Sequence, residues 1–256
     1  MRDYHSFRPI MKAIQTRFYV PISAMALLGF LTACQTPKKD PEFQSLGALK
    51  NVMHKGDLTP AADLNQLPID DQTYGVGPLS GLSGEVTIYR GQPYVSTIDK
   101  DGKEQVRVDE SAKAVFLAYG KVEKWRAYTI NKRINSLKSL ESTLASFMKL
   151  AGLDTEKPLA FHIEGKAKDV VYHVLNRKEG DPVGHAHHDK IKVKFDVKYL
   201  EGSFVGVWAD KDGPTRYVHH GDRIHVHFVA NDKKRSGHVD KLKLEAGAKL
   251  YLPDIR

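Results

Sequence analysis

The sequence predicts an α+β fold in which two packed, mixed and mostly antiparallel β-sheets carry a few short helices. Over residues 75–128, and again in several strands from residue 159 on, apolar residues recur at every second position, which is typical of strands with one buried face. Only residues 139–151 form a long run with helical spacing. The composition, with 41% hydrophobic and 27% charged residues, is ordinary for a globular protein and argues against low-complexity disorder. No block repeats at a fixed period, which argues against a solenoid or propeller.

The N-terminal segment has the order of a bacterial secretory signal. A basic stretch over residues 2–17 precedes an apolar run over residues 18–31, and Ala33-Cys34 follows directly. This run is the one stretch apolar enough to enter a bilayer, but it is too short for a comfortable transmembrane helix. We therefore predict that residues 1–33 are a signal peptide.

The residues that end this segment predict a lipid anchor. Leu31-Thr32-Ala33-Cys34 resembles the bacterial lipobox, whose cysteine is lipidated and becomes the mature N-terminus. The resemblance implies an exported protein held in the bacterial cell envelope through Cys34, at the outer membrane or facing the periplasm. The alternative is an ordinary signal with an incidental cysteine. Residues 34–44 are predicted to be a flexible tether, and residues 45–256 a single domain.

The remaining elements follow from hydrophobic spacing and turn residues. A short helix is predicted over residues 45–53, and a second one begins at Thr59, because threonine followed by proline is typical of a helix N-terminus. The longest helix covers residues 139–151 and ends at Gly152. Strands are predicted at residues 85–90, 94–98, 106–108, 159–165, 170–174, 191–197, 203–208, 223–230 and 238–244.

The charge distribution argues against a nucleic-acid partner. The formal net charge is +8, but part of the excess lies in the predicted signal peptide. The other Lys and Arg residues are scattered along strands rather than gathered with aromatic residues. We expect a solvated basic surface and no nucleic-acid binding.

Three histidines are placed where they can share a metal ion. His225 and His227 stand two residues apart on one predicted strand, so their side chains point to the same side. Residues 231–237 are polar and form a short hairpin connection, which places His238 directly opposite His227, with Cβ atoms roughly 5 Å apart. Three protein ligands with open positions are typical of catalytic zinc. The alternative is a histidine stripe that faces solvent.

The other histidines carry weaker signals. His185, His187 and His188 are predicted to lie in an exposed loop. His219 and His220 precede the histidine strand, where they either contact the metal ligands or face solvent. We expect ordinary structural positions for His54 and His162. A cupin-like barrel also uses two histidines on a strand, but the glutamate expected four or five residues later is replaced here by Asn231 and Asp232.

The sequence resembles the bacterial α-acetolactate decarboxylase family over roughly residues 45 to 252. The most specific block is His225-Val-His227-Phe followed by Ser236-Gly-His238-Val. The other similar blocks are Ser45-Leu-Gly-Ala-Leu with Gly56-Asp57, Tyr74-Gly-Val-Gly-Pro-Leu-Ser-Gly-Leu-Ser-Gly-Glu85-Val, and Gly202-Ser-Phe-Val-Gly-Val-Trp.

The resemblance implies a zinc enzyme of two packed sheets, in many members a homodimer, that converts 2-acetolactate to acetoin and carbon dioxide. Carried over by position, His225, His227 and His238 bind zinc and Glu85 is the catalytic carboxylate. A metal ion stabilises the negative charge that develops when carbon dioxide leaves, and a nearby glutamate delivers a proton. The alternative for Glu85 is an ordinary strand residue at the surface.

Two departures from the family pattern leave other functions open. The family has an arginine where this sequence has His173, with Arg177 a few residues further on; together with His220, these residues are candidates for binding the substrate carboxylate or supporting the metal ligands. For the family's second glutamate the sequence offers only Glu245. The alternatives are a divergent metalloenzyme with another small oxo-acid or ester substrate, and a metal-binding envelope lipoprotein.

Overall fold

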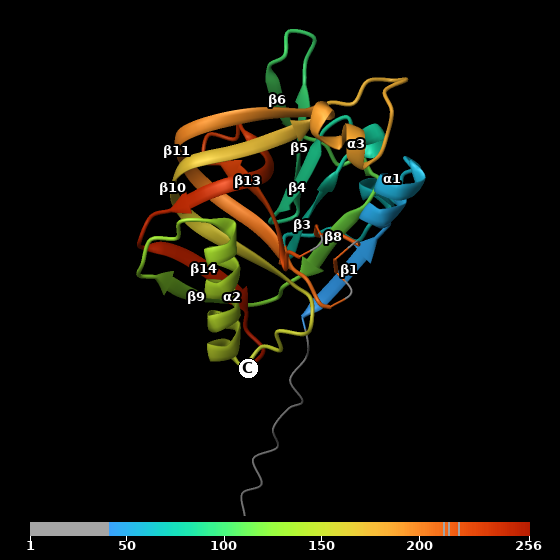
Figure 1. Ribbon diagram of the computed structural model, residues 1–256. Coiled ribbons are helices and arrows are strands. Elements are labelled where there is room, and N and C mark those ends of the chain that lie inside the picture. Colours follow the sequence, from blue (N-terminus) through green and yellow to red (C-terminus); the bar gives the residue numbers. More distant parts are fainter. Residues whose placement is uncertain (1–40, 212, 215, 220) are drawn as a thin grey trace, which may run out of the picture. The chain divides into compact units, whose positions relative to one another are not determined.

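The computed structural model describes residues 41–256 except 212, 215 and 220, so the predicted signal peptide, Cys34 and His220 lie outside the described residues (Figure 1). Two large sheets and few helices confirm the α+β prediction. The helices are α1 (Leu49–Lys55), α2 (Leu137–Ala151) and α3 (His185–His188), with 3₁₀ turns η1 (Leu64–Gln66), η2 (Ser80–Leu82) and η3 (Asp189–Ile191). In the described part of the chain, no helix is both long and apolar enough to cross a membrane.

The first sheet is wholly antiparallel and has the strand order β1-β8-β3-β4-β5-β6. Its strands are β1 (Glu42–Leu46), β3 (Thr73–Pro78), β4 (Glu85–Tyr89), β5 (Gln92–Ile98), β6 (Glu104–Val108) and β8 (Leu117–Lys121). A separate pair joins β2 (Ala62–Asp63) to β7 (Lys113–Ala114). The predicted hairpins at residues 85–108 are confirmed.

The second sheet has the order β11-β12-β13-β10-β14-β9. Its strands are β9 (Trp125–Ile130), β10 (Leu159–Leu175), β11 (Lys192–Trp208), β12 (Ile224–Ala230), β13 (Ser236–Leu244) and β14 (Ala248–Pro253). Because β10 also pairs with β11, the four strands β10 to β13 close into a ring. The sequence did not predict this closure.

Strands β10 and β11 are each continuous for 17 residues, where the sequence predicted two shorter strands in each case. The break predicted near residue 169 is a local irregularity rather than an end. Asp169 has a φ of 47°, and the pairing of β10 with β13 shifts register beside it, while the pairing with β11 continues on both sides. A bulge therefore bends the strand without ending it.

Helix α2 confirms the predicted helix at 139–151 and begins two residues earlier. Ser136 caps it by accepting a hydrogen bond from the backbone N–H of Ser139, and Gly152 ends it with a φ of 75°. Leu140, Leu144 and Met148 recur at helical spacing and are fully buried. They join the main hydrophobic core on one face of the second sheet.

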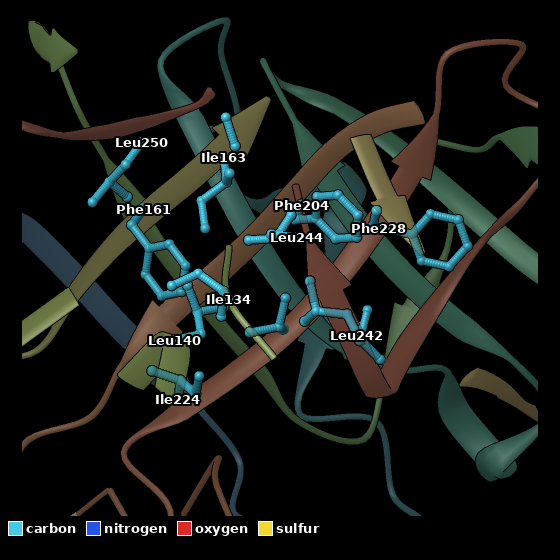
Figure 2. Packing of buried hydrophobic residues seen from close by; sticks show 14 of the residues in the cluster. Ile134, Leu140, Phe161, Ile163, Phe204, Ile224, Phe228, Leu242, Leu244 and Leu250 are labelled. Carbon is cyan, nitrogen blue, oxygen red and sulfur yellow. The ribbon is translucent and has the colours of Figure 1, made fainter. Parts of the chain in front are cut away.

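Side chains alternate in direction along strand β12, and this alternation determines which of them lie between the two sheets. Val226 and Phe228 point into the main core beside α2, where Figure 2 shows Phe228 next to Phe204. His225, His227 and Val229 point the other way, and Val229 belongs to a second core shared with the first sheet. The histidine pair is thereby buried between the sheets.

Two predictions near the start of the domain are corrected. Residues 42–44, predicted as part of the tether, belong to β1, which pairs with β8, and the helix predicted at 45–53 begins only at Leu49. No helix begins at Thr59. Instead, Ala61 donates a backbone hydrogen bond to Ala114, and this pairing draws the chain into β2. A tertiary strand pairing overrides the local helix signal.

Candidate metal centre and active site

Three imidazole nitrogens converge between the sheets. The register pairs His227 with His238 across strands β12 and β13, which confirms the pairing expected from the sequence. The Nε2 atom of His225 lies 3.0 Å from Nε2 of His227 and 2.9 Å from Nδ1 of His238. These three residues form a group whose ligand atoms could hold one metal ion.

The outer nitrogens of two rings have hydrogen-bond partners of their own. Nδ1 of His225 lies 2.8 Å from the carbonyl oxygen of Tyr217, and Nδ1 of His227 lies 3.2 Å from Oγ1 of Thr87. A carbonyl oxygen only accepts, so the neutral His225 ring donates from Nδ1 and keeps an unprotonated Nε2. This Nε2 atom therefore turns a lone pair toward the centre of the group.

Burial keeps these rings neutral. It lowers the pKa of His225 to about 3 and the pKa values of His227 and His238 well below the ordinary histidine value. Neutral imidazole is the form in which histidine binds metals. The residues therefore fit a divalent metal ion.

The first sheet brings one carboxyl group to this centre. Glu85, at the start of β4, is only 2% exposed. Its Oε2 atom lies 3.8 Å from Nε2 of His227, and its Oε1 atom lies 3.9 Å from Nε2 of His173. Burial raises the pKa of Glu85 well above its usual range, opposed in part by a backbone hydrogen bond involving Leu175. The surface position considered for Glu85 is excluded by this burial.

His173 is brought to the same place from β10. It pairs in register with His238, and the two rings are stacked with centroids 4.6 Å apart. Both carboxylate oxygens of Asp240 lie 3.0 Å from Nδ1 of His173. Sequence reasoning missed Asp240, although it stands two residues after His238 on the same strand and so shares its face.

The other candidates are placed differently. Arg177 donates a backbone hydrogen bond to Leu82 and a guanidinium hydrogen bond to the carbonyl of Asp181, and it is not among the residues that line the cavity beside the histidines. His220 lies outside the described residues. Its neighbour His219 is exposed, and its ring lies 6.3 Å from that of His238.

His188 corrects the prediction of an exposed loop at residues 185–188. The segment forms α3 beside α1 (Figure 1), and His188 is partly buried and lines the cavity. Its Nδ1 atom is buried without a hydrogen-bond partner among the described residues. His185, by contrast, is exposed and contacts His54. The burial of His188 could not be predicted from the sequence, because the segment around it is rich in polar residues.

A cavity of about 90 Å³ joins these groups. The acidic, basic and histidine side chains that line it are Glu85, His173, His188, His219, His225 and His238, together with Lys138, Glu141 and Asp222. The rest of the wall is mainly apolar and comes from α1, the start of α2, and strands and connecting segments of both sheets. A small apolar cavity with a few convergent polar groups suits a small organic substrate.

Two comparisons of the sequence with known proteins point to the same family. A family model described as alpha-acetolactate decarboxylase matches residues 49–253. An alpha-acetolactate decarboxylase from Streptococcus thermophilus is 24% identical over 211 residues, which cover 80% of this chain and 80% of that protein.

Two solved structures are similar to the fold. An alpha-acetolactate decarboxylase from Bacillus subtilis strain 168 matches with a TM-score of 0.66 and 18% identity, covering 82% of this chain and 84% of that one. A Staphylococcus aureus protein of unknown function, described as similar to alpha-acetolactate decarboxylase, matches with a TM-score of 0.64 at the same identity and coverage. These likenesses show a shared fold.

Proposed function

Because the chain belongs to the alpha-acetolactate decarboxylase family, a family of carboxy-lyases, we propose that it is a zinc-dependent enzyme that converts 2-acetolactate, or a related 2-hydroxy-3-oxo acid, to acetoin and carbon dioxide. One observation carries the proposal beyond the family match. The buried carboxyl group of Glu85 lies 3.8 Å from His227, in a group of three converging imidazole nitrogens.

The three histidines hold the metal ion in this proposal. His225, His227 and His238 supply neutral nitrogen ligands, which suit zinc with one or more open positions. When bound, zinc acts as a Lewis acid that stabilises the negative charge left on the substrate oxygens. The hydrogen bonds of His225 to Tyr217 and of His227 to Thr87 fix the ring orientations that this requires.

Glu85 supplies the proton. In the reaction the bond between the substrate carbon and its carboxylate breaks, carbon dioxide leaves with the carboxylate atoms, and the bonding electrons stay on the substrate. A proton must then reach that carbon to give acetoin. Glu85 lines the cavity and lies within 4 Å of both His173 and His227, and the apolar cavity wall limits access of water to it.

Acetoin formation tests the proposal directly. The purified, zinc-loaded protein is incubated with racemic 2-acetolactate, with the His225→Ala variant and the metal-free protein as controls. We expect acetoin from the zinc-loaded protein alone. Bound zinc without acetoin above the control level would contradict the assigned reaction and favour another small oxo-acid or ester substrate, or a metal-binding envelope lipoprotein.

We also propose that the protein is exported and anchored in the cell envelope by lipid on Cys34. The support is the order of basic, apolar and small residues in segment 1–34. The Cys34→Ser variant is expected to move from the membrane fraction to the soluble fraction of the cell. A variant that stays in the membrane fraction would contradict lipidation at this residue.

A homodimer is the assembly proposed from the family resemblance. Light scattering of the purified protein is expected to give twice the mass of one chain.

A further inference from the structure

Asp240 forms hydrogen-bond contacts with His173 at the edge of the site. It lies on β13, and both of its carboxylate oxygens are 3.0 Å from Nδ1 of His173. Its own side chain is 23% exposed and lines a separate groove, and it is not among the residues that line the cavity that holds Glu85. The cavity is therefore lined by His173 and not by Asp240.

The carboxylate decides how the His173 ring is turned. An ionised carboxylate accepts hydrogen bonds and does not donate them, so the nitrogen that faces it must carry the hydrogen. That nitrogen is Nδ1, and the neutral ring then presents an unprotonated Nε2 toward Oε1 of Glu85, 3.9 Å away. The stack of His173 on His238 holds the plane of the ring but does not select which nitrogen carries the hydrogen.

His173 therefore offers the cavity a hydrogen-bond acceptor. Its side chain is only 2% exposed, so water does not compete freely for Nε2. The group that faces Nε2 from the first sheet is the carboxyl of Glu85, whose Oε1 atom lies 3.9 Å away. Its other oxygen, Oε2, lies 3.8 Å from Nε2 of His227. The row Asp240, His173 and Glu85 thus links a carboxylate on β13 to the carboxyl group beside the three histidines.

We propose that Asp240 is a positioning residue, which holds His173 in the Nδ1–H form with Nε2 facing Glu85 and thereby orients the Glu85 carboxyl group for turnover. The part of this inference that concerns turnover rests on the proposed decarboxylase function. The part that concerns the His173 ring does not, because the ring's hydrogen position can be measured without substrate.

The Asp240→Asn variant of the full-length protein tests the inference. Asparagine keeps the shape of the side chain but adds an N–H₂ donor, so His173 can take the opposite form with hydrogen on Nε2. We expect kcat for acetoin formation to fall about 10- to 100-fold, the usual effect of losing the partner of an active-site histidine, with KM within about twofold and zinc content unchanged. Asp196→Asn is the matched control, because Asp196 is exposed on β11 and lines the same groove.

Nitrogen-15 NMR of the histidine rings in the zinc-loaded protein separates this inference from the proposed function. The wild-type protein is expected to show His173 with hydrogen on Nδ1, and the Asp240→Asn variant a shift toward hydrogen on Nε2. If both are seen but no acetoin is formed by the wild type, the assigned reaction fails and the positioning of His173 stands. Hydrogen on Nε2 in the wild type, or an unchanged kcat in an active Asp240→Asn variant, would overturn the inference.

Discussion

Replacing His225 or His238 with alanine is expected to empty the metal site and to slow acetoin formation by about a thousandfold or more. His225 has the central nitrogen of the group, within 3.0 Å of both of the others. Removing it leaves two ligands, too few to hold zinc in a catalytic site. Lewis-acid stabilisation is worth several kcal/mol, and each 1.36 kcal/mol changes a rate about tenfold. Zinc per chain and the rate of acetoin formation are the two measurements.

The matched control is His54→Ala. His54 is exposed on α1 and does not line the cavity, so zinc content and rate should stay at the wild-type level. Circular dichroism checks that the variants remain folded. Full zinc occupancy in both His225→Ala and His238→Ala would show that the metal binds elsewhere.

Replacing Glu85 with glutamine is expected to lower kcat by about 10²–10⁴ while zinc stays bound. Glutamine has nearly the same shape but no acidic proton to deliver, and this range is the usual cost of losing a catalytic acid or base. The carboxyl oxygens of Glu85 lie 3.8 Å from Nε2 of His227 and 3.9 Å from Nε2 of His173, which is beyond hydrogen-bond distance. The three histidine ligands are therefore expected to keep their arrangement in the glutamine variant.

Glu110→Gln is the control for this variant, because Glu110 is exposed between β6 and β7. The two proteins should bind zinc equally and differ only in turnover. An unchanged kcat in Glu85→Gln would remove this residue from the mechanism and leave the metal assignment in place.

The parts of the site that the sequence predicted are those set by local geometry. His225 and His227 share a face because side chains alternate along a strand, and the short hairpin connection puts His238 opposite His227. No packing of distant elements is needed for either step. The same holds for the predicted end of α2, where Gly152 donates to backbone carbonyl groups of the last turn.

The parts that it missed depend on contacts between elements far apart in the chain. Burial of His188 requires α3 to fold onto α1 and the cavity, which nothing within the histidine-rich segment specifies. No helix forms at Thr59, because the backbone N–H of Ala61 instead donates a hydrogen bond to the carbonyl oxygen of Ala114 in strand β7. Glu85 was predicted as a site residue from the family resemblance alone. Its carboxyl group reaches His173 and His227 only because the two sheets pack together.

All three converging histidine nitrogens lie on one hairpin, β12 and β13, while Glu85 comes from the opposite sheet. Closing so short a loop costs little chain entropy, so we expect the hairpin to keep its affinity for the proposed ion when the two sheets separate. Partial unfolding in mild denaturant is thus expected to abolish turnover before zinc is released. Zinc content then reports the integrity of the hairpin, and activity reports the docking of the sheets.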